Sequence, residues 1–186
     1  MKFFLAQLNP IVGDLNGNAK KILHVAAKAY SNSADMVLTP ELSLWGYPAK
    51  DLLLKKNLVE KQYTILDQLS ILVKKKYGDL CITVGIAEKI EDSFFPNLYN
   101  SVVLIERGEW KTIARKIILP TYEVFDEKRY FRSEESVSVI SKKINKKTYK
   151  IGITICEDLW VNENIEGRGI HKKNPISDLK SKKIDL

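Results

Sequence analysis

Cysteine is scarce in this chain of 186 residues, which contains only Cys81 and Cys156. Two thiols so far apart do not form the disulfide framework of a small secreted domain. Long apolar runs are also missing, and none approaches the roughly 20 residues that a membrane-spanning helix needs. The apolar N-terminus breaks at Gln7 without a small-residue cleavage site after it, which is not typical of a signal peptide. We therefore expect a cytoplasmic protein with no membrane partner.

Acidic residues are outnumbered by basic ones, 23 to 30, which leaves a net charge of +7. An excess of this size can indicate a nucleic-acid partner. The lysines are spread along the chain, however, and no aromatic residues alternate with them as a base-stacking surface would require. We interpret the clusters at 74–76, 142–147 and 180–183 as solvated faces and expect no nucleic-acid partner.

Hydrophobic periodicity predicts a mixed α/β fold, of the α/β or α+β class, with helices covering one face of a mixed sheet. One helix is expected to end near Ser33, with Asn16 or Asn18 as its N-cap, and another to span about 58–77. A helical turn is expected over 176–182. Strands are expected over 2–8, 35–38, 80–87, 98–106, 110–116, 137–140 and 149–155. The tight turn 107–109 predicts a hairpin, and the lysine-rich segment 141–147 is expected to be a turn.

Cys156 is the first candidate for catalysis, because an apolar, β-branched run ends at its thiol and two carboxylates follow at once. A strand that stops at a cysteine and turns sharply can present the sulfur at the edge of a sheet, where a nucleophile is useful. The alternative is a small core residue, since free cysteine is among the most buried residue types.

Two further reactive side chains follow predicted strands. Glu41 lies in an apolar loop just past one strand end, where a carboxylate is a candidate general base. Lys116 lies at the end of another strand. Both could meet Cys156 at one edge of a sheet, but Glu41 could also cap or pair locally, and Lys116 could be a solvated charge.

Three segments, 40–54, 116–131 and 152–160, together resemble the motifs of the carbon–nitrogen hydrolase (nitrilase) superfamily. Their long forms are similar to those of the N-terminal glutaminase domain of glutamine-dependent NAD+ synthetases. The resemblance implies that Glu41 is the general base, Lys116 the electrostatic stabiliser and Cys156 the nucleophile. The implied reaction hydrolyses the side-chain amide of glutamine through a cysteine thioester.

The same resemblance implies roles for three more residues. Glu127 matches a second glutamate that positions the lysine and the substrate, and Tyr122 matches a tyrosine that lines the glutamine pocket. Glu157 is expected to contact the substrate as well. The alternatives are surface pairing for Glu127 and core packing for Tyr122.

The implied fold is a four-layer αββα sandwich, here incomplete at its C-terminus, with residues 1–186 forming one amidase domain. The domain itself is expected to hold no metal or cofactor. Ammonia would pass to a synthetase domain that uses ATP and Mg²⁺ to amidate nicotinic acid adenine dinucleotide, in a full-length homo-oligomer. No pyrophosphate-binding loop is present in the chain, so we expect a fragment with weak or no activity by itself. A stand-alone amidase or nitrilase and an inactive remnant remain the alternatives.

Overall fold

A computed structural model describes residues 1–91, 94–144, 146–160 and 173–186 of the chain. These residues form two compact units. The first comprises Met1–Glu88 and Ser101–Thr112, and the second comprises Lys89–Asn100 and Ile113–Leu186. The chain therefore passes from one unit to the other within long strands.

The first unit is built on a five-stranded sheet with the strand order β1-β2-β3-β4-β5. Its first three strands are parallel, with Phe3 opposite Met36 and Met36 opposite Cys81. Parallel neighbours need long crossover connections, and the helices of this unit lie in those connections. The strands are β1 (Phe3–Leu5), β2 (Met36–Leu38), β3 (Cys81–Lys89), β4 (Leu98–Glu106) and β5 (Glu109–Arg115).

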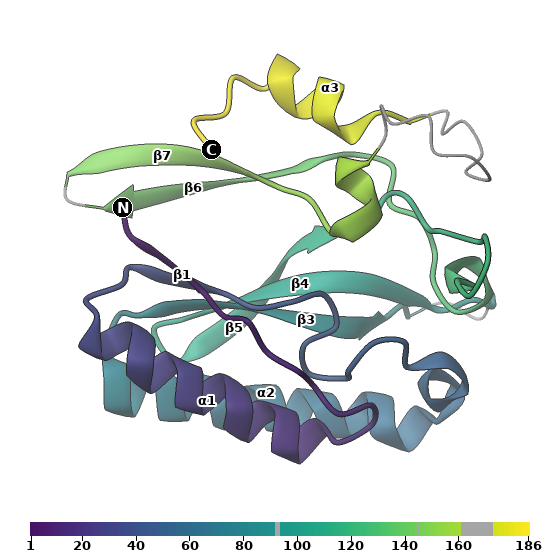
Figure 1. Cartoon of the computed structure of the whole chain (residues 1–186), viewed down its shortest axis with the longest axis horizontal. Coiled ribbons are helices and arrows are strands. Elements are labelled where there is room, and N and C mark those ends of the chain that lie inside the picture. The colour runs from purple at the N-terminus through teal and green to yellow at the C-terminus, as the bar shows by residue number, and fades with distance from the viewer. Residues whose placement is uncertain (92–93, 145, 161–172) are drawn as a thin grey trace. The chain divides into compact units, whose positions relative to one another are not determined.

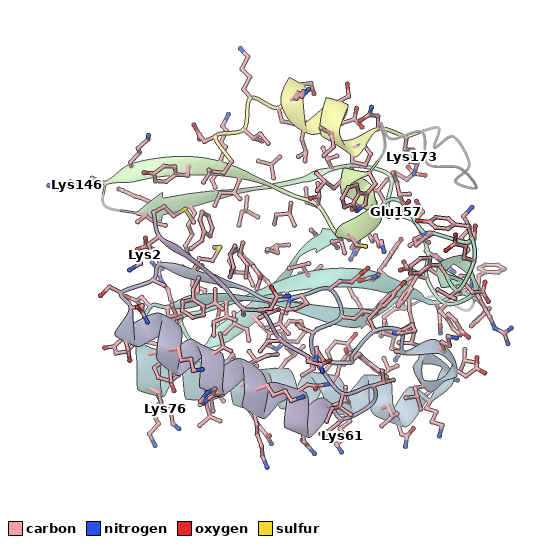
Figure 2. The ribbon with its side chains drawn as sticks, in the orientation of Figure 1. Lys2, Lys61, Lys76, Lys146, Glu157 and Lys173 are labelled. Atoms are coloured by element: carbon pink, nitrogen blue, oxygen red, sulfur yellow. The ribbon has the colours of Figure 1, made fainter. Side chains whose placement is uncertain are left out.

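Two helices, α1 (Leu15–Ser31) and α2 (Lys56–Tyr77), lie side by side on one face of this sheet (Figure 1). Their apolar residues recur at helical spacing, and the most deeply buried are Ile22, Ala26, Ala29, Leu66, Leu69 and Val73. Figure 2 shows Lys61 and Lys76 on the outer side of α2, directed away from the sheet. Both predicted helices are confirmed, and the lysine cluster at 74–76 is solvent-exposed.

The N-cap of α1 differs from the prediction. Asp14 caps the helix, because its Oδ1 accepts a hydrogen bond of 2.8 Å from the backbone N–H of Gly17. Asn18, one of the two expected caps, is buried inside the first turn. Its amide donates to the carbonyl oxygens of Ile11 and Leu44 and accepts from the Ile11 N–H. Asn18 therefore satisfies loop backbone groups instead of the helix end.

The predicted hairpin is present, since β4 and β5 are adjacent in the sheet and only two residues connect them. Those residues, Arg107 and Gly108, have φ angles of 57° and 91°. Two consecutive positive φ angles are typical of the type I′ turn, whose twist matches that of the flanking strands.

The second unit contains an antiparallel hairpin of β6 (Ser138–Ile144) and β7 (Lys147–Ile153). The prediction of a turn over 141–147 is wrong for most of its length, because the ladder continues to the pair Ile144 and Lys147. Exposed Ser141 and Lys143 alternate with less exposed neighbours, so the lysine-rich segment fits the two-residue period of a strand.

A short helix, α3 (Pro175–Ser181), lies beside β7 within the second unit (Figure 1). It begins at Asn174, whose side chain accepts a hydrogen bond from the Ser177 N–H. A Cβ placed on Gly152 of β7 would come within 2.9 Å of Leu179, so glycine permits this close packing. The predicted helical turn near 176–182 is confirmed. In the described part of the chain, no helix has the length and apolar character needed to cross a membrane.

We expect the substitution Asp14→Ala to lower the free energy of unfolding by about 0.5–2 kcal/mol, because it removes the cap of α1. Asn16→Ala, at an exposed position of the same first turn, is the matched control and should change stability by less than about 0.5 kcal/mol. Urea unfolding followed by circular dichroism measures both. Equal losses in the two variants would contradict the assignment of the cap to Asp14.

Candidate active site

Cys156 begins a short 3₁₀ helix, η3 (Cys156–Leu159), three residues after β7 ends. The residue is exposed, whereas Cys81 is buried, so the alternative of a core residue at 156 is wrong. Its φ angle is 47°, in the left-handed region that residues with a Cβ rarely adopt. Backbone strain of this kind costs on the order of 1–3 kcal/mol and is concentrated at functional sites. The turn thus presents the thiol to solvent in a constrained conformation.

The two residues that follow Cys156 are buried. Glu157 and Asp158 are 3% and 2% exposed, and Figure 2 shows Glu157 on η3. Trp160 ends this short helix, where its N–H donates to the Glu157 carbonyl oxygen.

Asp158 connects two segments of backbone that lie far apart in the sequence. Its Oδ2 accepts a hydrogen bond from the Ile155 N–H at 3.1 Å. Its Oδ1 accepts from the N–H groups of Ile117 at 3.1 Å and Ile118 at 2.8 Å. Burial raises the pKa of the Asp158 carboxyl above its ordinary value of 3.8, and the three N–H groups and the Lys116 charge oppose that rise.

Lys116 follows the last residue of β5 and has a side chain with no exposure to solvent. Its Nζ lies 2.8 Å from Oε1 of Glu127, whose side chain is 5% exposed. The interpretation of Lys116 as a solvated charge is therefore wrong, and Glu127 does not form a surface pair. Because both groups are shielded from water, the charge of Lys116 acts in a medium of low effective dielectric constant.

Backbone hydrogen bonds hold Lys116 and Glu127 in place. The Lys116 N–H donates to the Asn100 carbonyl oxygen at 2.8 Å, and its own carbonyl accepts from the Glu134 N–H at 3.0 Å. Glu127 begins another 3₁₀ turn, η2 (Glu127–Arg129), and its N–H donates to the Pro120 carbonyl oxygen. The ion pair therefore joins two anchored segments.

Tyr122 and Glu157 form a second polar pair in this unit. The Tyr122 hydroxyl lies 3.0 Å from Oε2 of Glu157, and the tyrosine ring meets the ring of Phe125 edge to face at 5.4 Å. The hydroxyl thus contacts the residue next to the thiol. The second unit contains five of the six predicted site residues, and two contacts join four of them: Lys116 with Glu127, and Tyr122 with Glu157, which follows Cys156.

Glu41 belongs to the first unit, in the turn that follows β2. Ser43 fixes this turn to β3, because its hydroxyl accepts a hydrogen bond of 2.9 Å from the Gly85 N–H and bonds to the Thr39 hydroxyl at 2.7 Å. Trp45 is fully buried and donates from Nε1 to Gln62 of α2 at 2.7 Å. The turn is firmly attached, and the role of Glu41 in catalysis stays a prediction.

Gly85 allows the backbone of the Glu41 turn to lie directly on β3. A Cβ at this position would lie 2.3 Å from the Leu42 nitrogen and 2.9 Å from the Pro40 carbonyl oxygen. Those distances are far shorter than ordinary contacts, so any side chain here would displace the segment on both sides of Glu41.

Among the residues that the structure describes, no group of three or more His, Cys, Asp or Glu side chains is placed to hold a metal ion. The arrangement offers an exposed thiol, a buried ammonium and buried carboxylates. These are the groups that a covalent acyl transfer with electrostatic stabilisation requires.

The family model for carbon-nitrogen hydrolases matches residues 5–166 of the chain. The chain belongs to the carbon-nitrogen hydrolase family. The resemblance seen in the three sequence motifs is thereby confirmed, and the matched residues include parts of both units.

Curated relatives of this carbon-nitrogen hydrolase are named glutamine-dependent NAD(+) synthetases. The protein from Synechocystis is 43% identical over 185 residues, which are 98% of this chain and 32% of the relative. The protein from Aquifex aeolicus is 40% identical over 162 residues, which are 87% of this chain and 26% of the relative. The chain thus spans about a third or less of the length of these relatives.

Solved structures confirm the predicted α/β fold of the nitrilase type. The glutamine-dependent NAD+ synthetase of Acinetobacter baumannii has a TM-score of 0.71 and 34% identity, covering 85% of this chain and 28% of that one. An amidase from Nesterenkonia sp. has a TM-score of 0.66 at 21% identity, covering 85% and 56% of the two chains. The amidase likeness concerns the fold alone.

The backbone contacts of Asp158 were not predicted from the sequence. A carboxylate at the third position of a helix often accepts a hydrogen bond from the backbone N–H of the N-cap residue. Asp158 stands in that relation to Ile155, so the local sequence contained a signal for this one bond. Its bonds to Ile117 and Ile118 span about 40 residues, and nothing in the local sequence indicates them.

We expect Lys116→Met to lower the free energy of unfolding by about 3–5 kcal/mol, because it leaves the Glu127 carboxylate buried without this cation. The double variant Lys116→Met/Glu127→Gln should lose less than the sum of the single variants. Lys74→Met, in an exposed pair with Asp79, is the control and should cost less than about 1 kcal/mol. Urea unfolding measures the series, and equal losses at Lys116 and Lys74 would contradict the burial of the pair.

Asp158 generates a prediction about pH. Because its folded-state pKa is raised, the stability that this carboxyl contributes is fully present below about pH 3.8 and is lost as the pH rises through the folded-state value. Asp158→Asn removes this titration. The difference in unfolding free energy between wild type and variant should therefore shrink from acidic toward neutral pH in urea titrations. A difference that stays constant or widens would contradict the direction of the shift.

Proposed function

We propose that this chain is a glutamine-hydrolysing amidase unit that supplies ammonia for the ATP-dependent amidation of nicotinic acid adenine dinucleotide to NAD+. The observation that carries the proposal is the presence, in one unit, of an exposed, strained Cys156 and a fully buried ammonium at Lys116. Similarity to a glutamine-dependent NAD(+) synthetase over 98% of the chain supports the choice of substrate.

In the proposed reaction, the sulfur of Cys156 attacks the side-chain carboxamide carbon of glutamine. Glu41 takes the thiol proton, since the thiolate is the effective nucleophile. The C–N bond then breaks, the proton passes from Glu41 to the departing ammonia, and a glutamyl thioester remains. Water, deprotonated by Glu41, cleaves the thioester to give glutamate and the free thiol. Protons and leaving groups balance over the cycle.

Lys116 is assigned the stabilisation of the oxyanion that forms when the carboxamide carbon becomes tetrahedral. A pre-placed positive charge in a site shielded from water acts strongly on developing negative charge and needs no reorganisation during the reaction. Glu127 keeps the ammonium in one orientation through the 2.8 Å contact. The backbone N–H of Glu157 is a second candidate donor to the oxyanion.

Tyr122 and Glu157 are assigned to glutamine recognition. Glutamine differs from a simple aliphatic amide in its α-ammonium and α-carboxylate groups. Glu157, a buried carboxylate adjacent to Cys156 and bonded to the Tyr122 hydroxyl, has the charge that complements an ammonium. This pair favours an amino-acid amide over a neutral one.

A stand-alone amidase is the second candidate, because the fold is shared with an amidase from Nesterenkonia sp.. The two candidates differ in the preferred substrate and in the need for a synthetase. Glutamine as a far better substrate than butyramide would favour the first, and the reverse preference would favour the second. An ATP- and Mg²⁺-dependent synthetase domain as partner, a homo-oligomeric assembly and a cytoplasmic location stay predictions.

We expect Cys156→Ala to abolish the release of glutamate from glutamine, because the substitution removes the group that forms the thioester. The protein at its full natural length should still make NAD+ when free ammonia is supplied. Cys81→Ala is the matched control, since Cys81 is buried in the first unit and should leave glutaminase turnover near the wild-type rate.

Glutamate release and NAD+ formation, each followed by a coupled assay, measure these outcomes. Wild-type glutamate release by the Cys156→Ala variant would exclude this residue as the nucleophile. Loss of ammonia-dependent NAD+ synthesis in the same variant would contradict two independent active sites.

A further inference from the structure

We propose that Asp158 is a positioning residue of the amidase site, which holds the backbone after Lys116 and the backbone before Cys156 in a fixed relation to each other. The inference rests on the proposed function and adds a residue to which the sequence motifs assign no role. It concerns the second unit alone, since every group involved lies within Lys89–Asn100 or Ile113–Leu186.

The geometry that carries the proposal is a single carboxylate accepting three backbone N–H groups, an arrangement called the Asp158 clamp below. Ile155, which precedes Cys156, donates to Oδ2. Ile117 and Ile118, which follow Lys116, both donate to Oδ1. The Asp158 N–H in turn donates to the Ile155 carbonyl oxygen at 3.1 Å. Ile155 and Asp158 are thus joined by two hydrogen bonds across the turn that contains Cys156. One side chain thus connects both reactive residues through their immediate neighbours.

The three N–H groups lie where the strands have ended. β5 ends at Arg115 and β7 ends at Ile153, so the donors at 117, 118 and 155 lie beyond the strands and their ladders. A buried N–H group without an acceptor costs free energy comparable to a lost hydrogen bond. Asp158 supplies that acceptor at two strand ends at once.

A carboxylate suits this position better than an amide. An ionised carboxylate only accepts hydrogen bonds and has two equivalent oxygens, whereas an asparagine side chain replaces one oxygen by an NH₂ donor. In Asp158→Asn, that NH₂ would face at least one backbone N–H. The variant keeps the size of the side chain and breaks part of the Asp158 clamp.

The consequence for the reaction follows from the strain at Cys156 and the burial of Lys116. A left-handed φ at a residue with a Cβ persists only where the surroundings determine it fully. Lys116 is likewise fixed on one side by Asn100 and Glu134, and on the other by the bonds of the next two residues to Asp158. Loosening the Asp158 clamp lets both reactive groups move, and a displacement of about 1 Å can cost on the order of 100-fold in rate.

The test uses the protein at its full natural length in a Cys81→Ala background, which leaves Cys156 as the single thiol of the 186 residues. Asp158→Asn and Asp158→Ala are compared with Asp185→Asn. Asp185 is a matched control, because its carboxylate also accepts a backbone N–H, from Lys150 at 2.8 Å, in the same unit. Leu66→Ala, in the buried face of α2, controls for a loss of stability without a change at the Asp158 clamp.

Two measurements are made on variants that circular dichroism shows to be folded. The first is kcat and KM for glutamine. The second is the rate at which iodoacetamide alkylates Cys156 as a function of pH, which needs no turnover. We expect Asp158→Asn to lower kcat by about 10- to 100-fold with a smaller change in KM, and to shift the alkylation curve of Cys156 away from that of the wild type. Asp185→Asn and Leu66→Ala should leave the alkylation curve in place.

A folded Asp158→Asn variant with wild-type kcat and a wild-type alkylation curve would overturn the proposal. The proposal also fails if Leu66→Ala produces the same changes, because the effect would then come from lower stability. Wild-type protein that does not hydrolyse glutamine would refute the proposed function instead. The alkylation curves would still decide whether Asp158 controls the environment of the thiol.

Discussion

The ion pair between Lys116 and Glu127 is the interaction on which the site of the second unit depends. Removing two charges from water costs several kcal/mol for each ion, and only close geometry and further hydrogen bonds offset that cost. The 2.8 Å separation supplies the first condition, and backbone hydrogen bonds of both residues hold the two side chains at that separation. The segment between the two residues is therefore held at both of its ends.

Backbone that has left a sheet needs new hydrogen-bond partners, and the two units solve this problem differently. In the first unit, the hydroxyl groups of Thr39 and Ser43 bond the Glu41 turn to β3, and Gly85 lets the two backbones touch. In the second unit, one buried carboxylate serves two strand ends. Both solutions keep a reactive residue just beyond a strand, where its side chain is not part of the sheet.

The local sequence pattern was sufficient to predict much of the fold and the position of Lys116 at the end of a strand. The bounds of β4 agree with the predicted strand 98–106, and the short connection at Arg107 and Gly108 indicated the hairpin. Lys116 was expected at a strand end and lies directly after β5. These features depend on alternation and turn chemistry, which neighbouring residues determine.

The errors arise where a side chain has a partner that the local sequence does not reveal. Asn18 has the chemistry of a cap, but backbone groups of Ile11 and Leu44 use its amide, and Asp14 caps the helix. The lysine-rich segment 141–147 was predicted to be a turn, but Lys143 lies at an exposed position of β6. The bonds of Asp158 to backbone about 40 positions earlier were missed for the same reason. The pairing of buried Lys116 with Glu127, 11 residues later, is likewise not indicated by its immediate neighbours.

Tryptophan placement gives this protein an optical property. Of its three tryptophans, Trp45 lies in the turn of Glu41 and is fully buried, and Trp160 ends the short helix of Cys156 and is 40% exposed. A buried indole emits at shorter wavelength than a hydrated one, so the two turns contribute different parts of the emission spectrum. With Trp110 replaced by phenylalanine, intrinsic fluorescence would follow each turn separately during ligand binding, and no external dye would be needed.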